Sequence, residues 1–188
     1  TGGALTTGAD VTVVLQNGAT ANNIFWVSEG ALSLAADTIM KGTLIAHNAA
    51  VSAAAGSNIE GRMFSTTGAI SLGPGTLTIP TGVSYIDLGV LSTFVIFSNS
   101  GAISNTEPST ITGDVGTNAG AIAGFENIDG NVYGPGAAPN PVNNTLVTFS
   151  IFQNAVLIAI SSRTTDINTC IISFCFTFFQ CRSSILSI

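Results

Sequence analysis

Side chains able to carry acid–base or nucleophilic chemistry are few in this sequence, and they do not cluster. The chain has one histidine, His47, and three cysteines, Cys170, Cys175 and Cys181, which all lie near its end. A serine or cysteine nucleophile needs a histidine base, and no nucleophile-elbow pattern surrounds any serine. No group of His, Cys, Asp and Glu has metal-ligand spacing. We therefore predict that the protein is not an enzyme and uses no metal or cofactor.

Composition narrows the class of partner. Charged residues make up 7% of the chain, against about 25% in a typical soluble protein. The four Lys and Arg residues are scattered and the formal net charge is −6, which excludes nucleic acid as a partner because phosphate binding needs clustered basic side chains. A hydrophobic content of 46% and a mean hydropathy of +0.53 are too high for a disordered chain. The sequence therefore predicts a folded protein with a nearly uncharged surface.

The elements that carry this surface are predicted from an internal repeat. Ala31, Ala50 and Ala69 recur at steps of 19 residues, and the turn at Met40-Lys41-Gly42 recurs as Ile59-Glu60-Gly61. Each unit has three short apolar stretches separated by Gly or Ala corners, which is typical of one coil of a β-solenoid. The predicted inward ladders are Leu32/Val51/Ile70, Met40/Ile59 and Leu44/Met63. We expect a mainly β protein.

The pattern changes after residue 78. The sequence TIPTG at 78–82 indicates a linker, residues 91–97 form an apolar stretch typical of a buried strand, and residues 144–161 have helical periodicity. Residues 167–188 are rich in Phe and Cys, contain no Gly or Ala, and are interpreted as an anomalous, frameshift-like tail. The predicted division is 1–82, 83–166 and 167–188.

Several motifs resemble a microbial ice-binding family. The stretches NNIFWV (22–27), GALSL (30–34), GTLIA (42–46) and GSNIEGR (56–62) are similar to the closing coils of that family. The stretches IDLG (86–89), FVIF (94–97) and STITGDVGTNAG (109–120) are similar to its opening part. The resemblance covers roughly residues 1–165 and implies an irregular, right-handed, three-sided β-solenoid (β-helix) with one helix alongside.

The order of these motifs is unusual, because closing coils precede opening coils. This order indicates a permuted or fragmentary domain, such as the end of one tandem repeat followed by the start of the next. We expect the two blocks to stack as one compact solenoid, with Leu88, Leu91, Phe94 and Ile96 buried against the ladder that contains Ile70 and Leu77, and with residues 145–160 as a helix along it.

The resemblance implies adsorption to ice through a flat face, with an extracellular location and a role in cold adaptation. Thr, Ala, Ser and Gly keep a stacked face flat, and Thr offers both a methyl and a hydroxyl group. Degenerate versions of the family's Thr-(Ala/Gly)-x-(Thr/Asn) tract occur at residues 7–10 and 55–58. The candidate ice-binding residues are Thr7, Thr38, Ser57, Asn58, Thr76, Thr110 and Thr112.

Two other functions remain open from the sequence. One is an adhesin-like or surface structural solenoid without affinity for ice, in which each Thr is an ordinary strand residue. The other is a polysaccharide-acting solenoid enzyme, which would need paired carboxylates on adjacent coils, and only Asp37 with Glu60 offers a weak pair. No signal peptide is visible at the start of the sequence.

Overall fold

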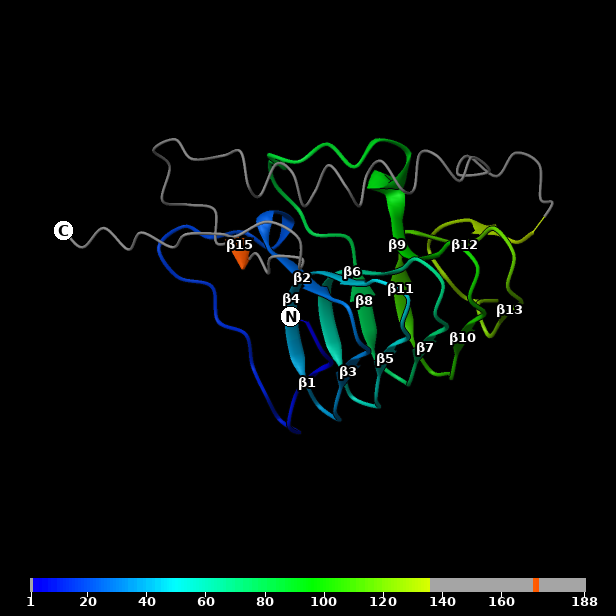
Figure 1. The fold of residues 1–188 in the computed structure, drawn as a ribbon, viewed down its shortest axis with the longest axis horizontal. Helices are drawn as coiled ribbons and strands as arrows, with labels where there is room; N and C mark the ends of the chain where they lie inside the picture. The colour runs from blue at the N-terminus through cyan, green and yellow to red at the C-terminus, as the bar shows by residue number, and fades with distance from the viewer. Residues whose placement is uncertain (1, 136–170, 173–188) are drawn as a thin grey trace.

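The computed structural model describes residues 2–135 and 171–172. Strands stack in parallel along one axis (Figure 1). Six of them form one sheet, which we call the first face: β1 (Leu5–Thr6), β3 (Leu32–Leu34), β5 (Val51–Ala53), β7 (Ile70–Leu72), β10 (Ile103–Asn105) and β13 (Ile122–Ala123). Each of these strands begins one coil, so the described chain is a β-solenoid of six coils.

Two further faces follow within each coil. The second face contains residues 39–41 of β4 (Ile39–Ala46), residues 58–60 of β6 (Asn58–Ser65), β8 (Thr76–Thr78) and β11 (Thr110–Thr112). The third face contains the remainder of β4 and β6 with β2 (Phe25–Ser28), β9 (Phe94–Ser98), β12 (Asp114–Thr117) and β14 (Val132–Tyr133). The chain turns between these two faces at Gly42 and Gly113, whose φ values of 109° and 130° favour glycine. The fold is thus three-sided and mainly β, as the sequence predicted.

Apolar ladders fill the interior. Alternate residues of a strand point inward, and parallel pairing in register places them above one another from coil to coil. The three ladders are Leu32, Val51, Ile70 and Ile103 on the first face; Met40, Ile59, Leu77 and Ile111 on the second; and Leu44, Met63, Ile96 and Val115 on the third. The predicted inward ladders are confirmed.

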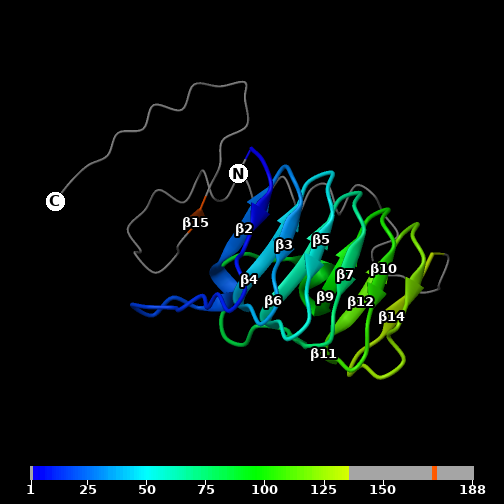
Figure 2. The ribbon, with the colours of Figure 1, turned by 90° about the horizontal axis from the view of Figure 1, so that it is seen from below.

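The blocks on either side of residue 80 form one continuous stack (Figure 2). Strand β6 pairs with β9, β7 with β10 and β8 with β11, so no boundary interrupts the sheets. Ile96 packs in the interior together with Ile70 and Leu77, as predicted. Leu88, Leu91 and Phe94 are buried as well, but they lie in a different cluster outside the solenoid. That part of the prediction is wrong because residues 79–93 leave the coil at the corner between the second and third faces, and because Phe94 packs on the outer side of β9.

We call residues 79–93 the strap. It crosses the outside of the third face and carries η2 (Gly89–Thr93), a short 3-10 helix (Figure 1). A second hydrophobic cluster lies between the strap and that face: Phe25, Ile45, Phe64, Ile86, Leu88, Leu91, Phe94 and Phe97. Outward-pointing Phe and Ile side chains on a sheet require such a cover, since their burial is what makes them favourable.

Polar contacts attach the strap at both ends. Near its start, Asn22 and Asn23 in η1 (Ala21–Asn23) donate side-chain hydrogen bonds of 3.0 Å to the carbonyls of Gly82 and Val83. Near its end, Nη2 of Arg62 donates to the carbonyl of Ser92 at 3.0 Å. Among the described residues no carboxylate pairs with Arg62, and burial of the guanidinium lowers the pKa of Arg62 to about 10.

Two predicted elements fall largely outside the described residues. The helix expected over 145–160 lies there entirely. Of the tail, only β15 (Ile171–Ile172) is described, and it pairs in parallel with β2. Within the described chain the helical elements are the two short 3-10 turns, and none is long and apolar enough to cross a membrane. The division into 1–82, 83–166 and 167–188 stays a prediction.

Candidate functional site

The second face presents two outward columns of side chains. One column contains Ile39, Asn58, Thr76 and Thr110, which are partners in the parallel ladder. The other contains Lys41, Glu60, Thr78 and Thr112 in the same register. Strands β8 and β11 therefore place Thr76, Thr78, Thr110 and Thr112 at the corners of a four-threonine array.

The array has the dimensions of the sheet itself. Paired residues on neighbouring coils are about 4.8 Å apart, and two outward residues of one strand are about 6.6 Å apart. The residues between them, Leu77 and Ile111, point inward and are buried, which fixes the direction of the threonines. Thr110 and Thr112 are exposed, whereas Thr76 and Thr78 are half-buried. The hydroxyl oxygen of Thr76 is buried without a partner.

Small side chains border this array at the corner with the first face. The backbone amides of Asp10, Asp37 and Gly56 donate to the carbonyls of Ala36, Ala55 and Pro74 on the next coil. These bonds align Ala36, Ala55 and Pro74 in one column, in which Pro74 lies on the coil of Thr76 and the two alanines lie on the coils of Lys41 and Glu60. On the coil of Thr110 this corner contains Glu107, whose side chain is exposed, so the low border covers only the earlier coils.

Two of the candidate residues are not on the surface. Thr38 is 0% exposed and Ser57 is 1% exposed, so the expectation that they project outward is wrong. Each hydroxyl turns back at the corner and donates 2.7 Å to a carbonyl three residues earlier, on Ala35 and Ala54 respectively. Such local bonds compete for Ser and Thr hydroxyls wherever the chain turns. These two side chains stabilise the corner.

Thr7 belongs to the same corner. Its hydroxyl lies 3.1 Å from that of Thr38 and accepts a bond from the backbone amide of Ala35. The remaining candidates, Asn58, Thr76, Thr110 and Thr112, share the second face. Thr78 is not among the seven candidates, although the alternating TLT and TIT tripeptides contain the signal for it, and the column of Ala36, Ala55 and Pro74 was missed.

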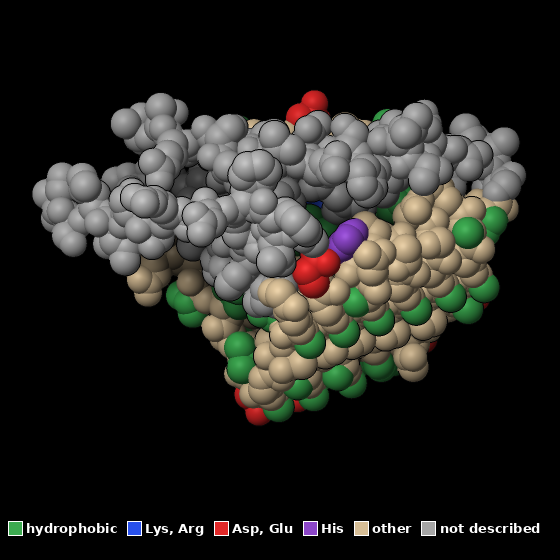
Figure 3. All heavy atoms as spheres, in the orientation of Figure 1, with side chains coloured by type: hydrophobic (Ala, Val, Ile, Leu, Met, Phe, Trp, Pro, Cys, Tyr) green, Lys and Arg blue, Asp and Glu red, His purple; other side chains and the backbone are tan. Residues whose placement is uncertain are grey.

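The first face is also flat and uncharged. Its outward column contains Thr6, Ser33, Ser52, Ser71, Ser104 and Ala123, in register over all six coils. A second column contains the alanines at 31, 50, 69, 102 and 121, whose carbonyls accept the bonds that join the coils. Figure 3 shows a row of regularly spaced hydrophobic side chains over these strands. Flatness alone therefore does not single out the second face.

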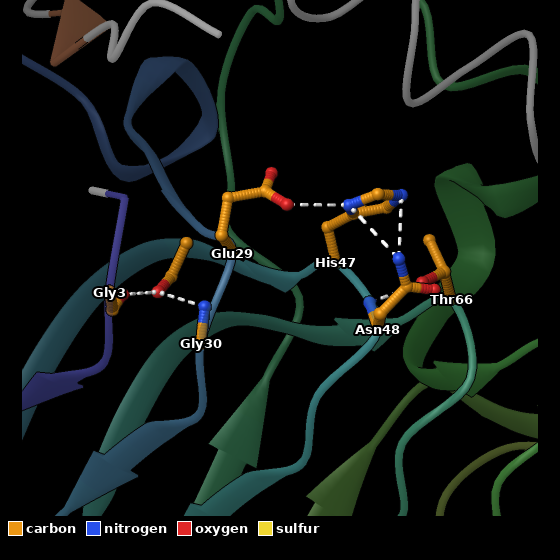
Figure 4. A network of polar contacts seen from close by, with 7 residues as sticks. Gly3, Glu29, Gly30, His47, Asn48 and Thr66 are labelled. Carbon is orange, nitrogen blue, oxygen red and sulfur yellow. Dashed lines mark hydrogen bonds and ion pairs between the residues drawn. The ribbon is translucent and has the colours of Figure 1, made fainter. Parts of the chain in front are cut away.

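His47 lies at the corner between the third and first faces, away from the four-threonine array. Its Nδ1 is 2.8 Å from Oε2 of Glu29 on the preceding coil, and both side chains are about one third exposed (Figure 4). The side-chain amide of Asn48 contacts the imidazole ring, and the backbone amide of Asn48 donates to the hydroxyl of Thr66. This is a polar corner network on three successive coils, consistent with a corner role for His47.

The residues considered for catalysis are dispersed among different contacts. Asp37 occupies a tight corner with a φ of 57°, while Glu60 forms an ion pair with Lys41 at 2.7 Å. Over residues 2–135, no group of three or more His, Cys, Asp and Glu side chains could hold a metal ion. Asp37 and Glu60 thus have separate structural contacts.

Comparison with known proteins yields one family and one solved structure. Residues 1–78 match the family model described as ice-binding-like. The solved structure is the crystal structure of an ice-binding protein from an Antarctic bacterium of the Flavobacteriaceae, 37% identical, with a TM-score of 0.40. The match covers 86% of this chain but only 39% of that one. No curated protein matches. Residues 1–78 thus match the ice-binding-like family, which confirms for that part of the chain the resemblance seen in its sequence.

Proposed function

We propose that the protein binds ice through the second face. The observation that carries the proposal is the four-threonine array of β8 and β11, held in register by paired strands. A rigid parallel ladder repeats each threonine at fixed spacing, so the methyl and hydroxyl groups of the exposed Thr110 and Thr112 can order water in a lattice without first losing side-chain freedom. Asn58 extends the array toward the preceding coil.

Two further features support the proposal. The strap covers the third face over β2, β4, β6 and β9, so the side chains there are not available to a planar ligand. The match to the ice-binding-like family includes strands of both the first and the second face, so it supports ice binding without choosing between these two faces. Ice as the partner and an extracellular location belong to the same proposal.

The test compares two exposed positions of one coil. Thr110 lies on the second face and Ser104 on the first face, and both side chains are exposed. Replacing Thr110 with Tyr places a ring above the array, so T110Y should strongly reduce thermal hysteresis and inhibition of ice recrystallisation. S104Y should leave both close to the parent values. Circular dichroism should show that both variants remain folded.

Two other results would change the assignment of the face or of the function. Loss of activity in S104Y, with T110Y unaffected, would place the ice contact on the first face. Absence of hysteresis and of ice shaping in the folded parent protein would contradict ice binding and favour a structural solenoid. Tyrosine at the buried Thr38 or Ser57 would disturb the corner packing and is not a test of ice contact.

A further inference from the structure

The column that contains Thr78 and Thr112 also contains charged side chains. Lys41 and Glu60 precede Thr78 in the ladder, on the two coils before it. At the other end, Asp129 forms a parallel bridge with Thr112 and is exposed. The threonine part of this column therefore covers two coils and has charged residues on both sides.

Lys41 and Glu60 form an ion pair between neighbouring coils. Nζ of Lys41 lies 2.7 Å from Oε2 of Glu60, and their side chains are 28% and 32% exposed. Both side chains are longer than threonine and end in charged groups that bind water strongly. Removing such groups from liquid water is costly, so an advancing ice surface should be excluded from this part of the column.

The fold does not depend on this ion pair. A partly exposed ion pair at the surface contributes about 0–1 kcal/mol to stability. Strands β4 and β6 are joined by a continuous ladder from Ile39/Asn58 to Ala46/Ser65, and Met40 and Ile59 fill the interior beneath the pair. Threonine is favourable in strands, so it can replace both charged residues without loss of the ladder.

We propose that the Lys41–Glu60 ion pair limits the ice-binding surface of the second face to its later coils. This inference rests on the proposed function and adds to it the residues that set the edge of the contact. It follows that replacing both residues with Thr would extend the threonine column from two coils to four.

The experiment compares K41T/E60T with the parent protein at equal concentration. We expect the double variant to give higher thermal hysteresis, with an unfolding temperature close to that of the parent. A matched control, E29Q, alters the contact between Glu29 and His47 on neighbouring coils, which lies at the corner between the third and first faces. E29Q should leave hysteresis unchanged.

The control for charge is K41Q/E60Q, which keeps long side chains but removes both charges. Higher thermal hysteresis in K41T/E60T than in the parent supports the inference. If K41Q/E60Q also shows higher hysteresis, the charges rather than the lengths of the two side chains limit the ice-binding surface. Unchanged or lower hysteresis in folded K41T/E60T would overturn the inference. If the parent is active and T110Y is inactive, unchanged hysteresis in K41T/E60T leaves the proposed function intact. An inactive parent protein would contradict the proposed function itself.

Discussion

Truncation of Leu91 to Ala should measure how firmly the strap is packed. Leu91 lies in η2, is 0% exposed, and belongs to the hydrophobic cluster between the strap and the third face. Its neighbour Val90 is 41% exposed and provides a matched control in the same turn. The two substitutions therefore differ mainly in the amount of buried apolar surface that they remove.

The expected magnitude follows from this burial. Replacing a fully buried Leu with Ala typically costs about 2–5 kcal/mol, because the transfer energy is lost and a cavity remains. In a protein of this size each kcal/mol lowers the midpoint of thermal unfolding by about 2–4 °C, so L91A should unfold roughly 4–20 °C below the parent. V90A should change stability by less than about 0.5 kcal/mol.

Thermal unfolding followed by circular dichroism would give both midpoints. Binding of a hydrophobic dye would report whether the strap detaches before the solenoid unfolds, since Phe97 and Ile45 would then become exposed. Equal midpoints for L91A and V90A would show that the strap contributes no packing energy. The reasoning about the outer cluster would then be refuted.

Three other predictions concern packing, charge and the tail. A Cβ at Gly101 would overlap the carbonyl oxygen of Gly68, so G101A should cost about 1–3 kcal/mol by urea unfolding, whereas G8A, with its nearest neighbour at 3.8 Å, should cost far less. The lowered pKa of Arg62, about 10, means that burying its charge costs stability at neutral pH, and that the cost falls as the pH rises above 10. R62M should therefore unfold at pH 7 no earlier than the parent in a thermal scan, and a clearly lower midpoint would contradict this. Deleting residues 167–188 should leave hysteresis unchanged, because β15 pairs with β2 on the third face; lost hysteresis in the folded deletion variant would be the contrary result.

Much of the solenoid could be predicted because small and apolar residues recur in the sequence with the period of one coil. The 19-residue step of Ala31, Ala50 and Ala69 became the register of the first face. The pairs Met40/Ile59 and Leu44/Met63 became inward ladders. Successive coils of equal length place identical positions above one another, and a sequence repeat reveals such coils directly, as it does for those that begin with β3 and β5.

The path of the strap could not be predicted in the same way. Pro80 and Gly82 indicate an interruption, but no periodic signal shows where the following residues go. The path of the strap is determined by tertiary contacts, because the outward-pointing Phe25, Ile45 and Phe64 need an apolar cover. A strand hydrophobic on both sides was visible at residues 94–97, yet the sequence does not say what lies against its outer side.

The candidate site was predicted only in part, because the local setting of a Thr or Ser decides whether its side chain points outward. Thr and Ser occur both on strand faces and at corners, and composition does not distinguish the two settings. At a corner the hydroxyl of Thr38 or Ser57 returns to a nearby carbonyl, whereas Thr110 and Thr112 alternate with a buried Ile and must point outward. The alternation within TIT is thus a better guide than threonine content.

The strap also shows where this scaffold accepts extra length. In coils that contain Gly42 or Gly113, one glycine joins the second face to the third, while residues 79–93 make the same connection in another coil. Strand β8 keeps its register with both neighbouring coils, and β9 does so from Ile96 onward, after one irregularity in its pairing with β12 between Asp114 and Val115. A long connection at this corner therefore disturbs the ladders only locally, and a peptide inserted at Gly113 would emerge beside the strap. An engineered protein could carry a tag, a label or a second binding module there while the threonine array on the adjoining face stays uncovered.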